Sequence, residues 1–176
     1  RIEDESGIVI KSYPNGYYWI DLQRSSCRDE AKAMGHCGNA TGNLFSLRKS
    51  KQPMLTGDVS RGSLVQLRGR ANTKPKSEYH SYIMDFLMLP EANINKMHPS
   101  SYKPEQNFEL KDLSLENLQT LYGSKPGLFV PEELYKVLIK YPEFINTVNL
   151  KLTNLWDEHK ADLSRRSPIL AQILGR

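Results

Sequence analysis

A chain of 176 residues, 39% hydrophobic and 25% charged, has the composition of one globular domain, or of one domain with an appended piece. A mean hydropathy of −0.56 and the lack of a long apolar run exclude a membrane-spanning helix, and the acidic, polar first residues predict no secretory signal peptide. The net charge of +4 and the isoelectric point near 9.0 permit contact with nucleic acid without requiring it.

Short runs of β-branched and alternating residues predict five strands in the first 70 residues. The Asn15-Gly16 pair between the first two runs is the strongest short-range signal for a β-hairpin. Polar turns separate the next three runs, which favours an antiparallel meander over a parallel sheet. The expected strands are residues 7–13, 17–22, 44–48, 54–59 and 64–68.

Helical signals interrupt and then follow these strands. Ser25 or Ser26 can cap a short helix that Gly35 ends. After Pro75, apolar residues recur at spacings of three and four, which predicts an amphipathic helix that lies across one face of the sheet and ends before Pro90. The expected helices are residues 27–34, 77–89, 113–122, 131–140, 143–163 and 168–174.

The chain changes from β-rich to helical near residue 90. Prolines and turn residues dominate the stretch that follows, which predicts a linker or a long surface loop. We therefore expect an α+β fold. A small antiparallel sheet, made of the hairpin and the three-stranded meander, packs with helices and is followed by an all-helical C-terminal part. The expected division is a β-rich module at 1–90, a linker or long loop at 91–111 and a helical region at 112–176.

His36 and Cys37 form the first candidate site for chemistry. A neighbouring imidazolium lowers the pKa of a thiol and makes it a better nucleophile. Residues adjacent in sequence usually point apart, so a buried cysteine beside a histidine that hydrogen-bonds the helix end is the preferred interpretation. The only other cysteine is Cys27, and two thiols favour a reducing compartment over a disulfide scaffold. Cysteine and histidine spacings match no usual zinc pattern, so we expect neither a metal nor a cofactor.

Basic and amide side chains gather in the meander and its turns. Such a sheet can hold phosphates or bases, although a solvated basic face is the plain alternative. The glycines lack the spacing of a nucleotide-binding phosphate loop. The candidate nucleic-acid-binding residues are Arg48, Lys49, Arg61, Gln66, Arg68, Arg70, Asn72 and Lys74.

Four short segments form a pattern: Met34, Gly35, His36 and Cys37, then Ser46, Leu47 and Arg48, then the Gln66-x-x-Gly69-x-x-Asn72 spacing, and Pro75. Together they resemble the core of the PcfJ-like proteins, a family found on conjugative elements and in tailed bacteriophages. The likeness covers about residues 13–88. The chain departs from the family pattern at Gly38-Asn39 and in the middle strand at residues 55–58.

The resemblance implies a setting on a phage or mobile element and carries no enzymatic activity over to this chain. We expect a non-enzymatic, virion-associated structural or accessory protein, located in the virion or the host cytoplasm. Its expected partners are other virion or nucleoprotein chains, with DNA or RNA at the basic sheet and no membrane. The alternative is a hydrolase or transferase that uses Cys37 with His36. We expect His36, Arg48, Gln66 and Asn72 to converge near one end of the meander, and an open pocket around them and Cys37 would favour the enzyme.

Overall fold

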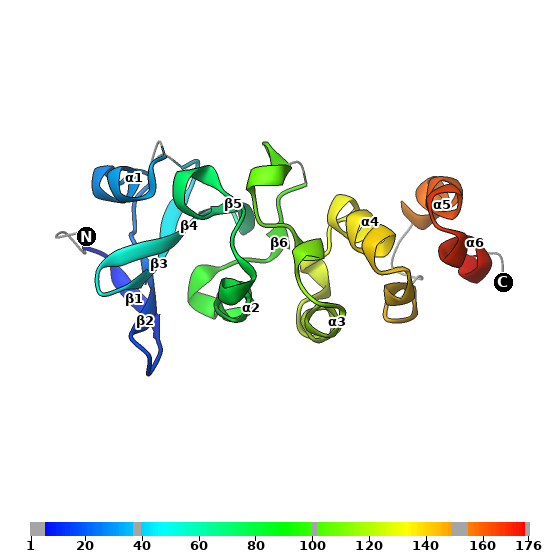
Figure 1. Ribbon diagram of the computed structural model, residues 1–176, viewed down its shortest axis with the longest axis horizontal. Helices are drawn as coiled ribbons and strands as arrows, with labels where there is room; N and C mark the ends of the chain where they lie inside the picture. The colour runs from blue at the N-terminus through cyan, green and yellow to red at the C-terminus, as the bar shows by residue number, and fades with distance from the viewer. Residues whose placement is uncertain (1–5, 37–39, 100–101, 149–154, 175–176) are drawn as a thin grey trace. The chain divides into compact units, whose positions relative to one another are not determined.

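The computed structural model describes residues 6–36, 40–99, 102–148 and 155–174 and has an α+β fold (Figure 1). Six strands form one sheet in chain order, and all neighbours are antiparallel except the last pair. The strands are β1 (Ile8–Ser12), β2 (Tyr17–Asp21), β3 (Asn43–Lys49), β4 (Gln52–Ser60), β5 (Ser63–Arg68) and β6 (Lys96–Met97). The helices are α1 (Arg28–Met34), α2 (His80–Met88), α3 (Leu115–Ser124), α4 (Pro131–Lys140), α5 (Leu155–Arg166) and α6 (Pro168–Leu174).

The predicted hairpin and meander are confirmed. In the hairpin turn, Gly16 has a φ of 92°, a backbone conformation that favours glycine. Gly57 and Asp58, which disfavour a strand by propensity, lie inside β4. Pairing with β3 and β5 on both sides overrides propensity there, and Gly57 lets the ring of Phe86 approach the strand closely.

Helix α1 begins one residue later than expected and has a different cap. The N-cap is Cys27 rather than Ser25 or Ser26, and its Sγ accepts the Glu30 backbone N–H at 3.4 Å. Gly35 ends the helix in the left-handed conformation with a φ of 67°, as predicted.

The two faces of the sheet have different chemistry, and α1 and α2 cover opposite faces (Figure 1). On the α2 face, the Phe86 ring stacks on Trp19 with centroids 4.2 Å apart and contacts Phe45 at 5.3 Å. Because alternate strand residues point to opposite faces, the other face carries the intervening residues. On β3, β4 and β5 most of these are polar: Ser46, Arg48, Thr56, Asp58, Gln66 and Arg68.

Most of the expected linker at 91–111 is packed structure. Strand β6 pairs with β5, and Ile94 and Phe108 are buried. The Asn107 Oδ1 accepts the Leu67 backbone N–H at 2.7 Å. The segment predicted as a linker or a long loop therefore contains one short strand, short 3₁₀ turns and buried side chains.

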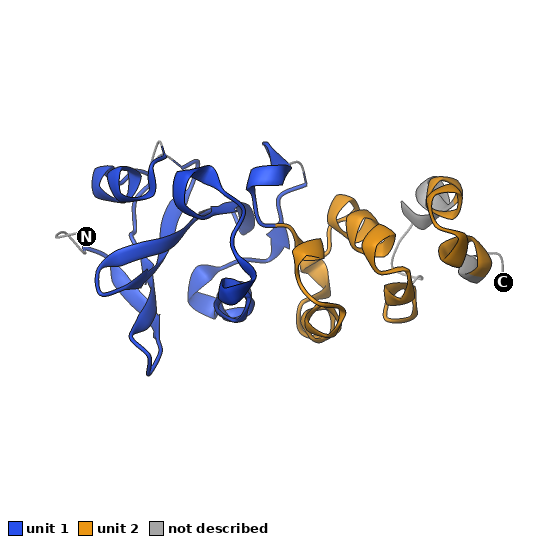
Figure 2. Ribbon diagram, viewed as in Figure 1, with its two compact units in different colours: residues 1–108 blue, residues 109–176 orange. Residues whose placement is uncertain are grey.

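The chain forms two compact units, residues 1–108 and residues 109–176 (Figure 2). The second unit is helical as predicted, although a 3₁₀ helix (Pro142–Asn146) stands where the sequence predicted the start of a longer helix. Inside this unit Glu133 is buried and accepts the Leu110 backbone N–H, and burial raises its pKa. In the part of the chain that the structure describes, no helix has the length and apolar character needed to cross a membrane.

A buried ion pair joins α1 to the sheet. The Glu30 Oε1 and an Arg48 terminal nitrogen lie 2.7 Å apart, and both side chains are 0% exposed. The Glu30 Oε2 also accepts the Ser46 hydroxyl at 2.8 Å and the Thr56 hydroxyl at 2.5 Å. One carboxylate on α1 therefore holds three side chains from β3 and β4.

We expect Glu30→Gln to lower the free energy of unfolding by about 3–5 kcal/mol, because the isosteric amide leaves the Arg48 charge buried without its counter-ion. Urea denaturation measures this loss. Asp29→Asn is the matched control, since Asp29 is exposed in the same helical turn and its removal affects only the interaction with the helix dipole, about 0.3–1 kcal/mol. Equal losses in the two variants would contradict the structural role of the ion pair.

Candidate functional site

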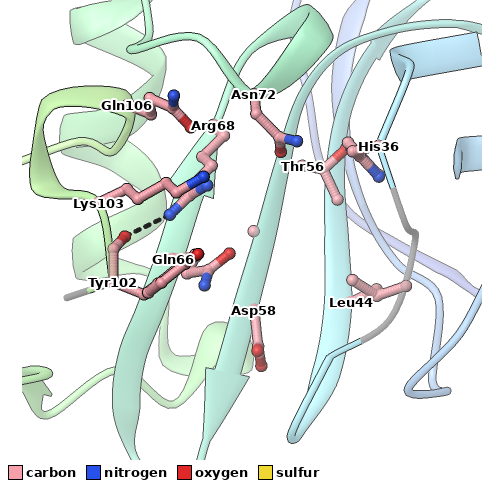
Figure 3. A pocket seen from close by; sticks show the side chains of 11 residues that line it. His36, Leu44, Thr56, Asp58, Gln66, Arg68, Asn72, Tyr102, Lys103 and Gln106 are labelled. Atoms are coloured by element: carbon pink, nitrogen blue, oxygen red, sulfur yellow. Dashed lines mark hydrogen bonds between the residues drawn. The ribbon is translucent and has the colours of Figure 1, made fainter.

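A pocket of about 360 Å³ opens on the polar face of the sheet, the face that α1 also covers (Figure 3). Its floor comes from neighbouring strands, because Thr56 pairs with Arg68 and Asp58 pairs with Gln66 across β4 and β5. Directly opposed residues in antiparallel strands have Cβ atoms roughly 5 Å apart. The strand register therefore fixes a compact group of four polar side chains.

The walls of the pocket come from three loops. His36 follows α1, and Asn72 belongs to the 3₁₀ turn Arg70–Asn72 after β5. Lys103 and Gln106 come from the segment after β6. In Figure 3, His36 lies toward one side of the pocket and Lys103 toward the other.

Asp58 lines the pocket and holds the loop that precedes β3. Its carboxylate is 7% exposed and accepts the backbone N–H of Thr41 at 3.0 Å and of Gly42 at 3.1 Å. Gly42 is required there, since an added Cβ would lie 2.0 Å from the Val59 carbonyl oxygen. The geometry gives Asp58 a structural role.

Arg68 is the main charge on the pocket floor. Its side chain is 6% exposed, and one terminal nitrogen donates to the Tyr102 carbonyl oxygen at 2.5 Å. The Nε–H has no hydrogen-bond partner among the described residues. Burial lowers the pKa of the guanidinium, which the nearby Glu105 partly offsets. A buried donor without a partner destabilises a protein by about 1–3 kcal/mol, so an oxygen acceptor in the pocket would complement it.

His36 is linked to the buried ion pair through Thr56. The His36 Nε2 and the Thr56 Oγ1 lie 3.1 Å apart, and the single Thr56 hydroxyl proton goes to the Glu30 carboxylate. Thr56 must therefore accept from His36, which places the imidazole proton on Nε2. Burial lowers the pKa of His36 below its ordinary value of 6.5, so the ring is neutral at pH 7.

The structure brings together three of the four side chains that the sequence predicted to converge. His36, Gln66 and Asn72 line one pocket, and Arg68 joins them. Arg48 lies behind the pocket, fully buried against Glu30. The expectation that Arg48 contacts nucleic acid is wrong, because its guanidinium cannot reach a ligand.

The other candidate residues are dispersed. Lys49 adjoins the β3–β4 turn and Arg61 the β4–β5 turn, at opposite ends of β4, and both are exposed. Arg70 and Lys74 flank Asn72 in sequence. Cys37 lies outside the described residues. The sequence predicted one broad basic face of the sheet. The structure instead has a pocket, with the other charged residues on separate turns.

Sequence reasoning missed Lys103, Tyr102 and Gln106, because the segment that holds them was expected to be a linker. Strand β6 has only two residues, which is too short to produce a periodic pattern in the sequence. The packing of the segment that follows it could therefore not be predicted. Among the described residues, no group of three His, Cys, Asp or Glu side chains is placed to hold a metal ion. Comparison with protein-family models, curated proteins and solved structures gives no match for this chain.

We expect acidification through pH 6.5 to destabilise the fold through His36. Unfolded His36 binds its proton near pH 6.5, whereas the folded ring binds it only at lower pH, so this contribution is complete above pH 6.5 and is lost as the pH falls toward the folded pKa. Urea denaturation at several pH values should show a steeper loss in the wild type than in His36→Gln. An NMR titration that places the His36 pKa at or above 6.5 would contradict this.

Proposed function

We propose that this chain is a nucleic-acid-binding accessory protein of a bacteriophage or other mobile element, and that its pocket binds a phosphate of the strand. The observation that carries the proposal is Arg68, a buried guanidinium with an unsatisfied Nε–H at the pocket floor. Arginine donors match phosphate oxygens in charge and in geometry, and such charge-assisted hydrogen bonds are about twice as strong as neutral ones.

Four other pocket side chains fit the same ligand, while the Asp58 carboxylate at the floor is held by backbone N–H groups of the loop that precedes β3. Lys103 adds a second positive charge, and Gln66, Asn72 and Gln106 offer amide groups that donate and accept hydrogen bonds. Phosphate contacts position a nucleic-acid strand, while amides contact sugars and base edges. The net charge of +4 attracts a polyanion to the protein as a whole.

The phage or mobile-element setting is supported by the PcfJ-like resemblance. Three of the residues that carry it, His36, Gln66 and Asn72, come from separate segments of the sequence and line one pocket. A common ligand explains why such separated positions would share a pattern. In this setting the protein is a virion-associated structural or accessory component with other virion or nucleoprotein chains as partners.

One observation favours a second candidate, an enzyme that uses Cys37 as nucleophile. His36 lies in the pocket, burial lowers the pKa of its ring, and Cys37 is the next residue in the chain. A neutral imidazole is the form that accepts a proton from a thiol.

For the main proposal we expect Arg68→Gln to weaken the binding of a fluorescein-labelled single-stranded (dT)12 by roughly tenfold or more, because a hydrogen bond to a charged group contributes about 1.5–3 kcal/mol. Fluorescence anisotropy at several salt concentrations gives the affinity. The slope of log affinity against log salt concentration should fall in magnitude by about one. The matched control is Lys96→Gln, which removes an exposed charge on β6 outside the pocket. Unchanged thermal unfolding would show that Arg68→Gln folds. Absence of salt-dependent binding to DNA and RNA by the wild type would refute the proposal.

For the enzyme candidate we expect Cys37 to react with iodoacetamide rapidly at pH 6–7, as a thiolate with a lowered pKa does. Mass spectrometry separates its modification from that of Cys27, the buried N-cap of α1, which serves as the internal control. His36→Gln should slow the reaction of Cys37. A rate that rises only near pH 8.5, the ordinary range of a thiol, would exclude an activated nucleophile.

A further inference from the structure

Four tyrosines form a cluster outside the pocket, where side chains of the hairpin contact those at the start of α2. The ring centroids of Tyr82 lie 4.8 Å from Tyr13 and 4.7 Å from Tyr17, and those of Tyr17 and Tyr79 are 6.4 Å apart. All four side chains are half-buried, so each ring keeps some exposed surface. We call these four residues the tyrosine cluster.

Exposed basic side chains surround the tyrosine cluster. The Lys49 Nζ lies 5.0 Å from the centroid of Tyr17, and the Lys11 Nζ lies 5.6 Å from that of Tyr13. Arg70 is close enough to Tyr79 to interact with it electrostatically. The combination of aromatic rings and positive charge is the one that proteins use to bind single-stranded nucleic acid.

Acidic side chains do not cancel this charge. Asp85 accepts the Tyr13 hydroxyl at 2.7 Å, and Glu78 is exposed beside Tyr79. Against these two carboxylates stand the three basic groups of Lys11, Lys49 and Arg70. The surface therefore favours an anionic partner.

Contacts between the hairpin and α2 explain the positions of Tyr13 and Tyr82 better than those of Tyr17 and Tyr79. The Tyr13 hydroxyl donates to Asp85, and the Tyr82 hydroxyl accepts from Asn15 at 2.7 Å, so these two rings hold the hairpin on α2. Tyr17 and Tyr79 pack on each other at the edge of the cluster. The Lys49 ammonium lies over the Tyr17 ring there, and both Lys49 and Arg70 are exposed.

We propose that the tyrosine cluster binds the bases of a single strand of nucleic acid whose phosphate occupies the pocket. The link is the 3₁₀ turn Arg70–Asn72, since Asn72 lines the pocket and Arg70 is close enough to Tyr79 to interact with it electrostatically. Two residues apart, their Cα atoms are at most about 7.6 Å from one another. The pocket opens on the α1 face of the sheet and the tyrosine cluster lies beside α2. A strand held at the pocket must therefore pass around the end of the sheet, at this turn, to stack on Tyr79 and Tyr17. The inference rests on the proposed function and narrows the partner to single-stranded nucleic acid, because the bases of a duplex are already stacked inside it.

The test measures two probes, inorganic phosphate and single-stranded (dT)12, on the same variants. We expect Tyr79→Leu to weaken (dT)12 binding roughly tenfold, Tyr79→Phe to change it little because the ring remains, and phosphate binding to stay the same in both. Arg68→Gln should weaken both probes. An iododeoxyuridine-labelled strand should crosslink to Tyr17 or Tyr79 in the wild type.

Lys49→Gln keeps the test decisive if Tyr79→Leu does not fold. Lys49 is exposed, so its substitution spares the core, and we expect weaker (dT)12 binding and a salt slope lower by about one. Lys96→Gln again serves as the control.

Each outcome separates the two proposals. If Arg68→Gln weakens (dT)12 binding while the tyrosine and Lys49 variants bind normally, the pocket function stands and the tyrosine cluster is overturned. If the tyrosine and Lys49 variants weaken it while Arg68→Gln does not, the cluster stands and the pocket proposal fails. Equal affinity for a 12-base-pair duplex and for (dT)12, or no binding of (dT)12 at all, would overturn the inference.

Discussion

The geometry of the pocket depends on the buried ion pair between Glu30 and Arg48. A carboxylate and a guanidinium withdrawn from water are tolerated only where other hydrogen bonds complete their coordination. Glu30 meets this condition by accepting from Arg48, Ser46 and Thr56, which belong to two strands. A shift of α1 by one residue would turn Glu30 away from the sheet. The buried Arg48 guanidinium would then have no counter-ion. The pair thus sets the position of α1 on β3 and β4, and with it the position of His36 just beyond the helix.

The two faces of the sheet have complementary energetic roles. On the α2 face, the packed rings of Trp19, Phe45 and Phe86 supply hydrophobic stabilisation that is independent of pH and of ligands. The polar face carries a cost, since the Arg68 Nε–H is buried without a partner among the described residues. A ligand that satisfies this donor binds the folded state alone and therefore stabilises it. The hydrophobic stabilisation of the apolar face offsets the free-energy cost of the unpaired Arg68 donor on the polar face. This donor can then bind a ligand.

Local signals in the sequence predicted local structure well. The Asn15-Gly16 hairpin and the Gly35 helix end are decided within a few residues, so the sequence was sufficient for both. The α1 cap was predicted wrongly because three consecutive residues, Ser25, Ser26 and Cys27, all carry an acceptor, and tertiary packing selected the thiol.

The burial of Arg48 and the packing of the segment after β6 have non-local causes that the sequence did not reveal. Alternation shows that Ser46 and Arg48 share a face of β3, but it does not show that a helix carrying Glu30 covers this face. The segment around Lys103 is held by a two-residue strand pairing and by Asn107, whose partner Leu67 is forty residues earlier in the chain. No periodicity in a sequence records a contact of that kind. His36, Gln66 and Asn72 were expected together because a family resemblance, unlike periodicity, relates distant positions.

The turn Arg70–Asn72 gives the proposed binding surface a property that neither half has alone. A phosphate in the pocket provides salt-dependent affinity for any phosphorylated ligand, whereas stacking on the tyrosine cluster requires exposed bases. A free nucleotide can occupy one contact at a time. A continuous strand that fills the pocket and passes around the end of the sheet at this turn would present its next bases to the tyrosines at a raised effective concentration. Two individually weak contacts can thus discriminate a single-stranded polymer both from the free nucleotides around it and from duplex.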